Sequence, residues 1–245
     1  MLLKSIKMTV NNKKISFDFK NKRNIILSGT NKMNLICALE MLLSSDFNNN
    51  IATKDAVYGF NYADITDSIL VFSNDSLLAG KGGRVVKQGN IPKIHCIRYT
   101  KNGTLRSYIF SDVACNASVG KSLTEYSSVL NDTDWFRLCA TVNKFIGKNI
   151  VDIYNGKLLF NFATDIEYSE EAQKFIYLLF AECMLTPDDF NRVVLLNDID
   201  LLDKSAQLKL LDYLDSMKNH SCCISTVNVS FDDISSKSNI ALLSI

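Results

Sequence analysis

An apolar strand that passes through a glycine turn into a helix constrains the fold of this chain more than any other feature. The apolar run Ile25–Leu27 ends at the turn residues 28–31, and a helical pattern extends from Leu35 to Leu43 with Asn34 as its expected N-cap. A strand joined to a helix by a short turn is the repeating unit of α/β proteins. The start of the sequence therefore predicts an α/β fold.

A second segment of this kind lies near the other end of the sequence. The strand expected at Arg192–Leu196 is apolar without alternation after its first residue, which is typical of a strand covered on both faces of a parallel sheet. A helix at about 203–218, with Asp203 as its cap, and a short strand at about 221–226 are expected to follow. Together the two ends predict one α/β core.

The middle of the chain is rich in predicted strands. Asn102-Gly103 predicts a hairpin because both residues tolerate positive φ, and similar turns are expected at Asn11-Asn12 and Asn155-Gly156. We therefore expect a single domain, 1–245, that opens with a β-hairpin and carries a strand-rich inserted lobe at about 48–120.

Composition excludes several classes of protein. With 47% hydrophobic residues and a net charge of +1, the chain is too apolar for a disordered protein and has no overall charge that favours nucleic acid or membranes. Its seven cysteines are scattered and only two histidines are present, which speaks against a zinc site and for a reducing compartment. No signal peptide or membrane span is found, so we expect a cytoplasmic protein without a membrane partner.

The first candidate site is the glycine turn itself, at the place where a phosphate-binding loop would lie. Such a loop uses backbone N–H groups, a lysine for the phosphates and a hydroxyl for Mg²⁺. The residues that could still contact a nucleotide are Gly29, Thr30, Asn31, Lys32 and Asn34. Leu35 stands at the lysine position, and Ile36 and Cys37 stand at the hydroxyl positions. The alternative is a strand-to-helix turn that binds nothing.

A second candidate phosphate loop follows the strand at 105–110. Gly120, Lys121 and Ser122 match the end of such a loop, although Cys115 stands where the first glycine is expected. The alternative is an ordinary loop in which Ser122 or Thr124 caps the next helix.

Polar residues after the strand at 192–196 form the third candidate. An apolar strand that ends in carboxylates is how nucleotide hydrolases hold Mg²⁺ and polarise water. Here the metal position is the neutral Asn197, the water position is Asp198, and Asp200 is a further carboxylate, so that Asp198 and Asp200 are the candidate metal ligands and Asp198 the candidate catalytic residue. The alternative is a polar strand end before the cap at Asp203.

The fourth candidate is the segment Tyr168–Gln173. Ser169, Glu171 and Gln173 fall where a nucleotide-binding signature would lie ahead of the third site. Ser169 as an N-cap with Glu170 and Glu171 in the first helical turn is also good helix chemistry by itself.

In their order along the chain, these segments resemble the ATPase heads of the ABC superfamily, specifically the SMC, RecF and OLD-type branch of AAA ATP-binding proteins. The resemblance rests on the opening hairpin at 3–19, the Gly29 turn, the strand and acidic residues at 193–200, the helix at 205–211 and the strand at 223–226. It implies a P-loop NTPase-like fold, and ATP and Mg²⁺ as ligands if the site is retained.

The sequence departs from the family pattern at the positions that bind and hydrolyse the nucleotide. The lysine of the phosphate loop is replaced by Leu35, the Mg²⁺ carboxylate by Asn197 and the switch histidine by Val227, and Glu170 and Glu171 occupy the small-residue positions of the signature. In active members that signature meets the γ-phosphate held by a partner subunit, and carboxylates there would repel it. The resemblance with these substitutions predicts a pseudo-ATPase that needs no cofactor.

Such a protein would act through protein contacts. The resemblance implies a second copy, an active ATPase relative or a nuclease effector as partner, in genome maintenance or antiviral defence. Two alternatives remain open. One is a nucleotide-dependent switch in which Lys32 or Lys121 replaces the missing lysine. The other is a DNA-associated structural subunit that uses the basic residues of the middle segment, Lys81, Arg84, Lys87, Lys93, Arg98, Lys101 and Arg106.

Overall fold

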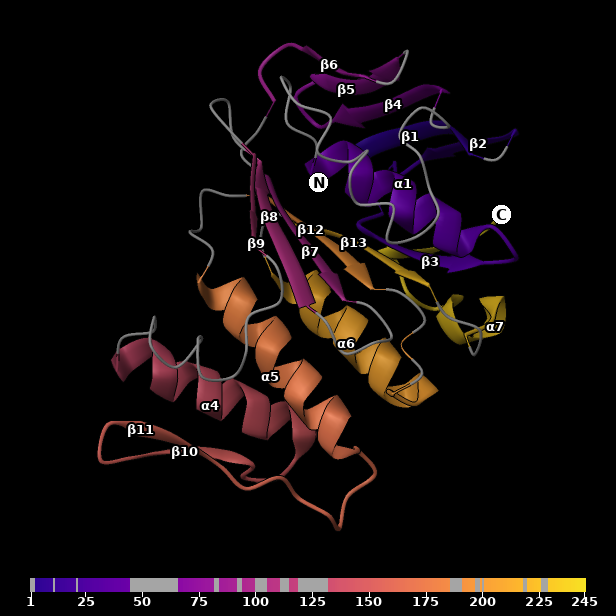
Figure 1. Cartoon of the computed structure of the whole chain (residues 1–245). Helices are drawn as coiled ribbons and strands as arrows, with labels where there is room; N and C mark the ends of the chain where they lie inside the picture. Colours follow the sequence, from indigo (N-terminus) through magenta and orange to yellow (C-terminus); the bar gives the residue numbers. More distant parts are fainter. Residues whose placement is uncertain are drawn as a thin grey trace.

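The computed structural model describes residues 3–10, 12–20, 22–44, 66–81, 84–91, 94–99, 105–110, 115–118, 132–185, 191–196, 199, 201–217, 220–225 and 229–245. Within these ranges the chain forms a large mixed sheet with helices on both faces and a separate antiparallel sheet (Figure 1). None of the helices in these ranges is long and apolar enough to span a membrane.

The larger sheet contains seven of the described strands. The first five strands across it pair in parallel, and the last two are added by antiparallel pairing, each to the strand before it. Their spatial order is β14 (Ile240–Ser244), β3 (Asn24–Ser28), β13 (His220–Ser225), β12 (Asn191–Leu196), β7 (Ile94–Tyr99), β8 (Leu105–Phe110) and β9 (Cys115–Ser118). Val193–Leu196 are buried, as expected for a central strand with helices on both sides. The predicted α/β class and the parallel core are confirmed.

The smaller sheet is antiparallel and combines the opening hairpin with strands from the middle of the chain. Its described strands are β2 (Lys13–Asp18), β1 (Leu3–Val10), β4 (Thr66–Phe72), β5 (Leu77–Lys81) and β6 (Arg84–Gln88), in that spatial order. Helix α1 (Lys32–Ser44) contacts strands of both sheets, and Leu35–Glu40 are all buried. A helix that is apolar all round must be covered on all sides, and the two sheets provide that cover.

The opposite face of the larger sheet is covered by the other long helices (Figure 1). Helix α5 (Glu170–Leu185) lies between α4 (Asp132–Ile146) and α6 (Lys204–Ser216). A hairpin of β10 (Val151–Tyr154) and β11 (Lys157–Phe160) lies against α4, and the short helix α7 (Phe231–Ile234) precedes β14. One apolar cluster joins these helices to the sheet and includes Phe145, Phe180 and Leu210.

Strands of the predicted inserted lobe divide between the two sheets. β4, β5 and β6 pair with the opening hairpin, whereas β7, β8 and β9 extend the larger sheet. The segment at about 48–120 is therefore not one separate sheet within its described residues. The reason lies in β7, where Ile94–Ile97 are all buried and so require cover on both faces.

The prediction that Asn34 caps the first helix is wrong. Helix α1 begins at Lys32, and the Leu35 N–H donates to the Asn31 carbonyl at 3.1 Å, which closes the first turn around Asn31. Two other local predictions are confirmed, whereas the Asn102-Gly103 turn lies outside the described residues. Asp203 caps α6 through the Ala206 N–H at 2.7 Å. Asn155 and Gly156 form the β10–β11 turn with φ of 50° and 68°.

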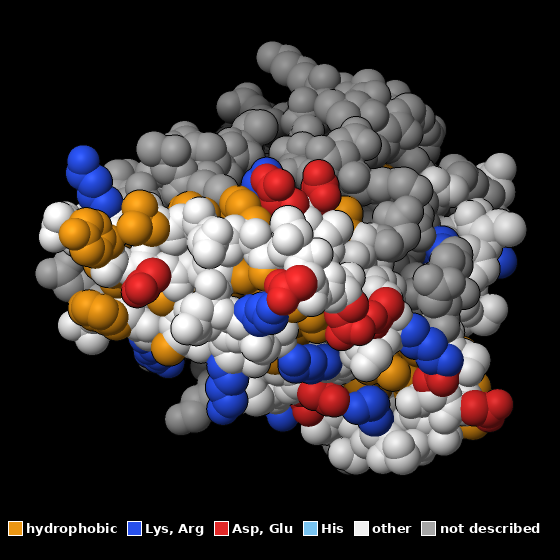
Figure 2. Space-filling model, turned by 90° about the horizontal axis from the view of Figure 1, so that it is seen from below, with side chains coloured by type: hydrophobic (Ala, Val, Ile, Leu, Met, Phe, Trp, Pro, Cys, Tyr) orange, Lys and Arg blue, Asp and Glu red, His pale blue; other side chains and the backbone are white. Residues whose placement is uncertain are grey.

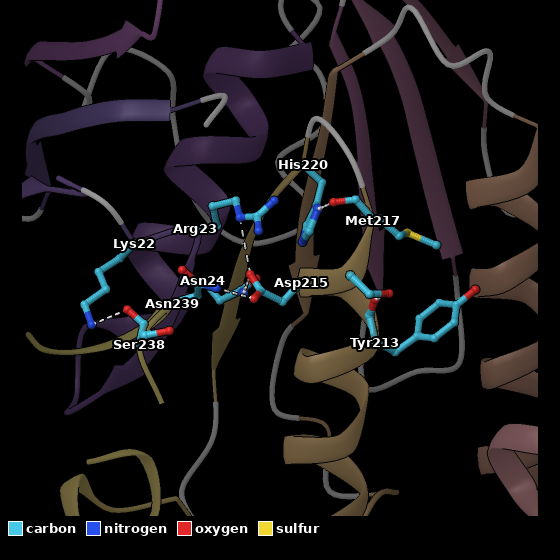
Figure 3. A network of polar contacts seen from close by, with 10 residues as sticks. Lys22, Arg23, Asn24, Tyr213, Asp215, Met217, His220, Ser238 and Asn239 are labelled. Atoms are coloured by element: carbon cyan, nitrogen blue, oxygen red, sulfur yellow. Dashed lines mark hydrogen bonds and ion pairs between the residues drawn. The ribbon is translucent and has the colours of Figure 1, made fainter. Parts of the chain in front are cut away.

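A polar network ties the amino ends of the strands to the end of α6 (Figure 3). The Asp215 carboxylate accepts from Asn24 Nδ2 at 2.8 Å and from Asn239 Nδ2 at 2.6 Å, and it lies 3.4 Å from Arg23 Nε. Arg23 and Asn24 also donate their backbone N–H groups to the Asn239 carbonyl, each at 3.1 Å. One carboxylate thus joins α6, β3 and β14.

His220, at the start of β13 beside this network, predicts a loss of stability in acid. Burial lowers its pKa from the ordinary 6.5 to about 4, against the opposing hydrogen bond between Nδ1 and the Met217 carbonyl. The unfolded chain therefore binds more protons between these values, and stability falls as the pH drops through that window. We expect this residue to account for a loss of about 2 kcal/mol between pH 7 and pH 5.

Urea unfolding of the wild type and of His220→Asn at both pH values measures this contribution. The asparagine amide can keep the hydrogen bond to Met217 but does not titrate, so the variant should lose less stability than the wild type over the same interval. An equal loss in both proteins would contradict the assignment to His220.

Candidate functional site at the carboxyl edge of the parallel sheet

The first and third predicted sites follow strands that end at the same edge of the larger sheet. β3 precedes Gly29 and β12 precedes Asn197, and both strands pair in parallel with β13, which lies between them. The register aligns Leu196 with Ile224 and Ile224 with Ile26. With a spacing of about 4.8 Å between neighbouring strands, the two strand ends lie roughly 10 Å apart.

The turn after β3 is short. Only Gly29, Thr30 and Asn31 separate the end of β3 at Ser28 from the start of α1 at Lys32. A phosphate-binding loop needs a longer connection before its helix begins, because its backbone must pass around the phosphate. Lys32 and Asn34, predicted as loop residues, belong to the helix instead.

The main chain of Ile245, which follows β14, closes this turn from the side. The Ile245 N–H donates to the Ser28 carbonyl at 2.9 Å, and the Asn31 N–H points to the Ile245 carbonyl at 3.4 Å. Gly29 has φ of +96°, and a Cβ on it would lie 2.0 Å from the Ile245 oxygen. The Asn31 N–H is thus directed at protein rather than at an open anion site.

Residues at the lysine and hydroxyl positions of the loop lie in the core. Leu35 and Ile36 are fully buried and Cys37 is 2% exposed. They lie on different sides of α1, and all three are enclosed by protein. Restoring a lysine at 35 would bury a charge rather than rebuild the site.

The acidic candidates and the second loop fall outside the described residues. These are Asn197, Asp198 and Asp200 after β12, and Gly120, Lys121 and Ser122 before α4. Neighbouring groups are well fixed: Gln207 Nε2 donates to the carbonyls of Ile199 and Leu202, at 2.8 and 2.9 Å. In the described part of the chain, no cluster of His, Cys, Asp and Glu could hold a metal ion.

The signature-like segment lies at the start of α5, where its side chains form hydrogen bonds with the backbone. Ser169 Oγ accepts from the Ala172 N–H at 3.2 Å, as expected of an N-cap. Gln173 is fully buried, accepts from the Ala163 N–H at 3.0 Å and donates to the carbonyls of Ala163 and Tyr168, at 2.7 and 2.9 Å. Its amide fixes the preceding loop, so of the three predicted residues only Ser169 and Glu171 lie exposed.

The described basic residues of the middle segment lie on strands of both sheets. Lys81, Arg84 and Lys87 lie on β5 and β6 of the smaller sheet, whereas Arg98 and Arg106 pair with each other across β7 and β8 of the larger one. Lys93 and Lys101 lie outside the described residues. A nucleic-acid surface that uses these residues stays a prediction.

Comparisons with known proteins find structural likeness without sequence likeness. No family model matches the chain, and the comparison with curated proteins finds no match. The SMC head domain from Thermotoga maritima is 13% identical, with a TM-score of 0.43 over 99% of this chain and 94% of that one. An SMC head bound to the C-terminal winged-helix domain of ScpA is 11% identical, with a TM-score of 0.46 over 100% and 95%.

The recombination mediator RecF is also similar, at 11% identity and a TM-score of 0.38 over 99% of this chain and 95% of that one. Likeness at this level assigns no activity, ligand or partner to the chain.

Proposed function

We propose that this chain is a P-loop-ATPase-like head of ABC type that has lost its nucleotide chemistry and serves as a structural or regulatory subunit through protein contacts. The three-residue turn after β3 carries the proposal, because it leaves no loop to surround a phosphate. The Ile245 main chain beside the turn and the buried Leu35 add to it. The common edge of β3 and β12 is the feature that relates the fold to nucleotide hydrolases.

Exposed apolar side chains support the part of the proposal that concerns protein contacts. Tyr154 and Leu159 are 65% and 51% exposed and lie diagonally on the outer face of the β10–β11 hairpin, and Phe136 on α4 is 63% exposed. Figure 2 shows apolar side chains gathered at one end of the face that carries these elements, with mixed charges across its middle. Surface apolar groups that gather in this way are typical of interaction sites.

ATP turnover tests the proposal directly. We expect the purified protein to show no magnesium-dependent ATP hydrolysis above background, because neither the lysine nor the loop that would hold the phosphates is present. The measurement is phosphate release with and without Mg²⁺, in the wild type, in Asp198→Ala and in Lys32→Gln.

Two outcomes would contradict it. Turnover that Asp198→Ala abolishes would show a working catalytic site. Magnesium-dependent ATP binding that Lys32→Gln abolishes would instead favour the nucleotide switch. Mass spectrometry of proteins that copurify with the chain from its own cell addresses the partner, and a reproducible stoichiometric partner is expected.

A further inference from the structure

A groove lies at the opposite end of the helical layer from the candidate site. It forms a cavity of about 950 Å³ between α4, α5, α6 and the start of β12. This volume is in the range of pockets that bind small organic molecules. The groove does not include the Gly29 turn, and no part of the proposed function uses it.

Cations line the groove from α4, α6 and β12. Its described lining residues are Arg137, Ala140, Thr141, Lys144, Phe145, Cys183, Met184, Arg192, Lys209, Tyr213, Ser216 and Met217. Four of these are basic and none is acidic. On α4, Arg137 and Lys144 share one helical face two turns apart, so that about 10 Å separates them along the axis. Lys209 lies on the α6 side, and the buried Arg192 comes from β12.

Three of these cations have no carboxylate partner among the described residues. Arg137 and Lys144 form no ion pair there, and Lys209 donates to the Phe145 carbonyl and lies 4.6 Å from the centre of that ring. Like charges gathered in one cavity repel each other, and an anion that binds between them removes that repulsion. The groove is therefore electrostatically suited to a ligand with several negative charges.

The remainder of the lining provides apolar contact and one tyrosine hydroxyl. Phe145 and Tyr213 line the groove, and each contacts the ring of the buried Phe180, at 5.4 and 4.3 Å between ring centres. Burial raises the pKa of Tyr213 to about 12, so its hydroxyl stays protonated and can donate. Figure 3 shows the Tyr213 side chain directed away from the Asp215 network. The hydroxyls of Thr141 and Ser216 donate to the carbonyls of Arg137 and Tyr213, at 2.8 and 2.6 Å, so they can meet a ligand only as acceptors.

We propose that this groove binds a small organic molecule that carries two or more phosphate groups. Guanidinium and ammonium groups at the walls match phosphate oxygens, and the spread of Arg137 and Lys144 along α4 matches more than one phosphate. The aromatic and sulfur-containing side chains accommodate the organic part. The exposed Arg137 and Lys144 are the residues that select for the charge.

Calorimetric titration with sodium pyrophosphate, without Mg²⁺ and at low salt, tests the site. We expect saturable binding that weakens as salt is added and that falls at least about tenfold in the double variant Arg137→Gln/Lys144→Gln. Both side chains are exposed, so the variant should fold, and its thermal unfolding verifies this. The matched control is Lys13→Gln/Lys14→Gln on β2, which removes the same charge from an exposed strand and should leave binding unchanged.

Each of the other outcomes overturns the proposal. No heat at millimolar pyrophosphate, or an equal loss in the two double variants, would remove the site. Loss of binding in Lys32→Gln but not in the groove variant would place the anion at the Gly29 turn and count against the proposed function instead. Tighter binding of citrate, or binding of an oligoglutamate peptide but not of pyrophosphate, would assign the groove to carboxylates.

Discussion

Replacing Gly29 with alanine is expected to lower the free energy of unfolding by about 3 kcal/mol, because the new Cβ meets backbone and a positive φ together. The Cβ would lie 2.0 Å from the Ile245 oxygen, a distance that no flexible side chain can relieve. Either the end of β14 leaves β3 or the turn distorts. Urea unfolding measures the loss, and hydrogen exchange of β14 amides shows whether that strand is the one released.

The matched control for this variant is Gly147→Ala at the end of α4. Gly147 has φ of +87°, close to the +96° of Gly29, but a Cβ there meets nothing within 4 Å. Gly147→Ala should lower the free energy of unfolding by only about 1 kcal/mol, which is the cost of a positive φ at alanine. If Gly29→Ala were no more harmful than Gly147→Ala, the β14 end would not lie against the turn, and the closure of that turn would be wrong.

Replacing Gln173 with leucine is expected to cost about 3 kcal/mol of stability without creating a cavity, since the two side chains are similar in size. The change leaves the Ala163 N–H and the carbonyls of Ala163 and Tyr168 without their amide partner in a buried position. Each unsatisfied buried group costs about 1–3 kcal/mol, and partial access of water to the loop reduces the sum. Chemical unfolding of the variant gives the value.

Glu171→Leu is the control for that prediction. Glu171 lies on the same helical turn but is exposed, so its replacement should change stability by no more than about 0.5 kcal/mol. A similar small effect for Gln173→Leu would mean that the amide is free to serve another role, as the signature interpretation of this segment requires.

Elements with a local cause could be predicted from the sequence. The apolar run before Leu196 predicted a central parallel strand because helices cover both of its faces. The Asn155-Gly156 turn, the Ser169 cap and the Asp203 cap each depend on residues at most three positions away, and each is present. Such elements can be recognised from the sequence because the residues that interact are close neighbours along the chain.

Features that depend on distant residues could not be predicted in the same way. Pairing of β14 with β3 joins segments from opposite ends of the sequence, and nothing near Gly29 indicates that Ile245 lies beside it. The early start of α1 has the same origin, because that short turn is fixed by tertiary contacts and not by the apolar pattern beginning at Leu35. The separation of β6 from β7 into different sheets likewise leaves no local signal.

The cations of the groove could be predicted only in part from the sequence. Arg137 and Lys144 stand at helical spacing and could have been placed on one face of α4 from the sequence. That Lys209 and Arg192 approach the same cavity follows only from the packing of α6 and β12 around α5.

The position of α1 determines how this molecule can respond to force. Because the helix is embedded in both sheets, rotating one sheet against the other would tear apart a single apolar contact region that includes Leu39, Leu70 and Val193. The described parts of the two sheets are therefore held together through α1. Moving the opening hairpin relative to the parallel strands would break these contacts, so we expect the two sheets to move together.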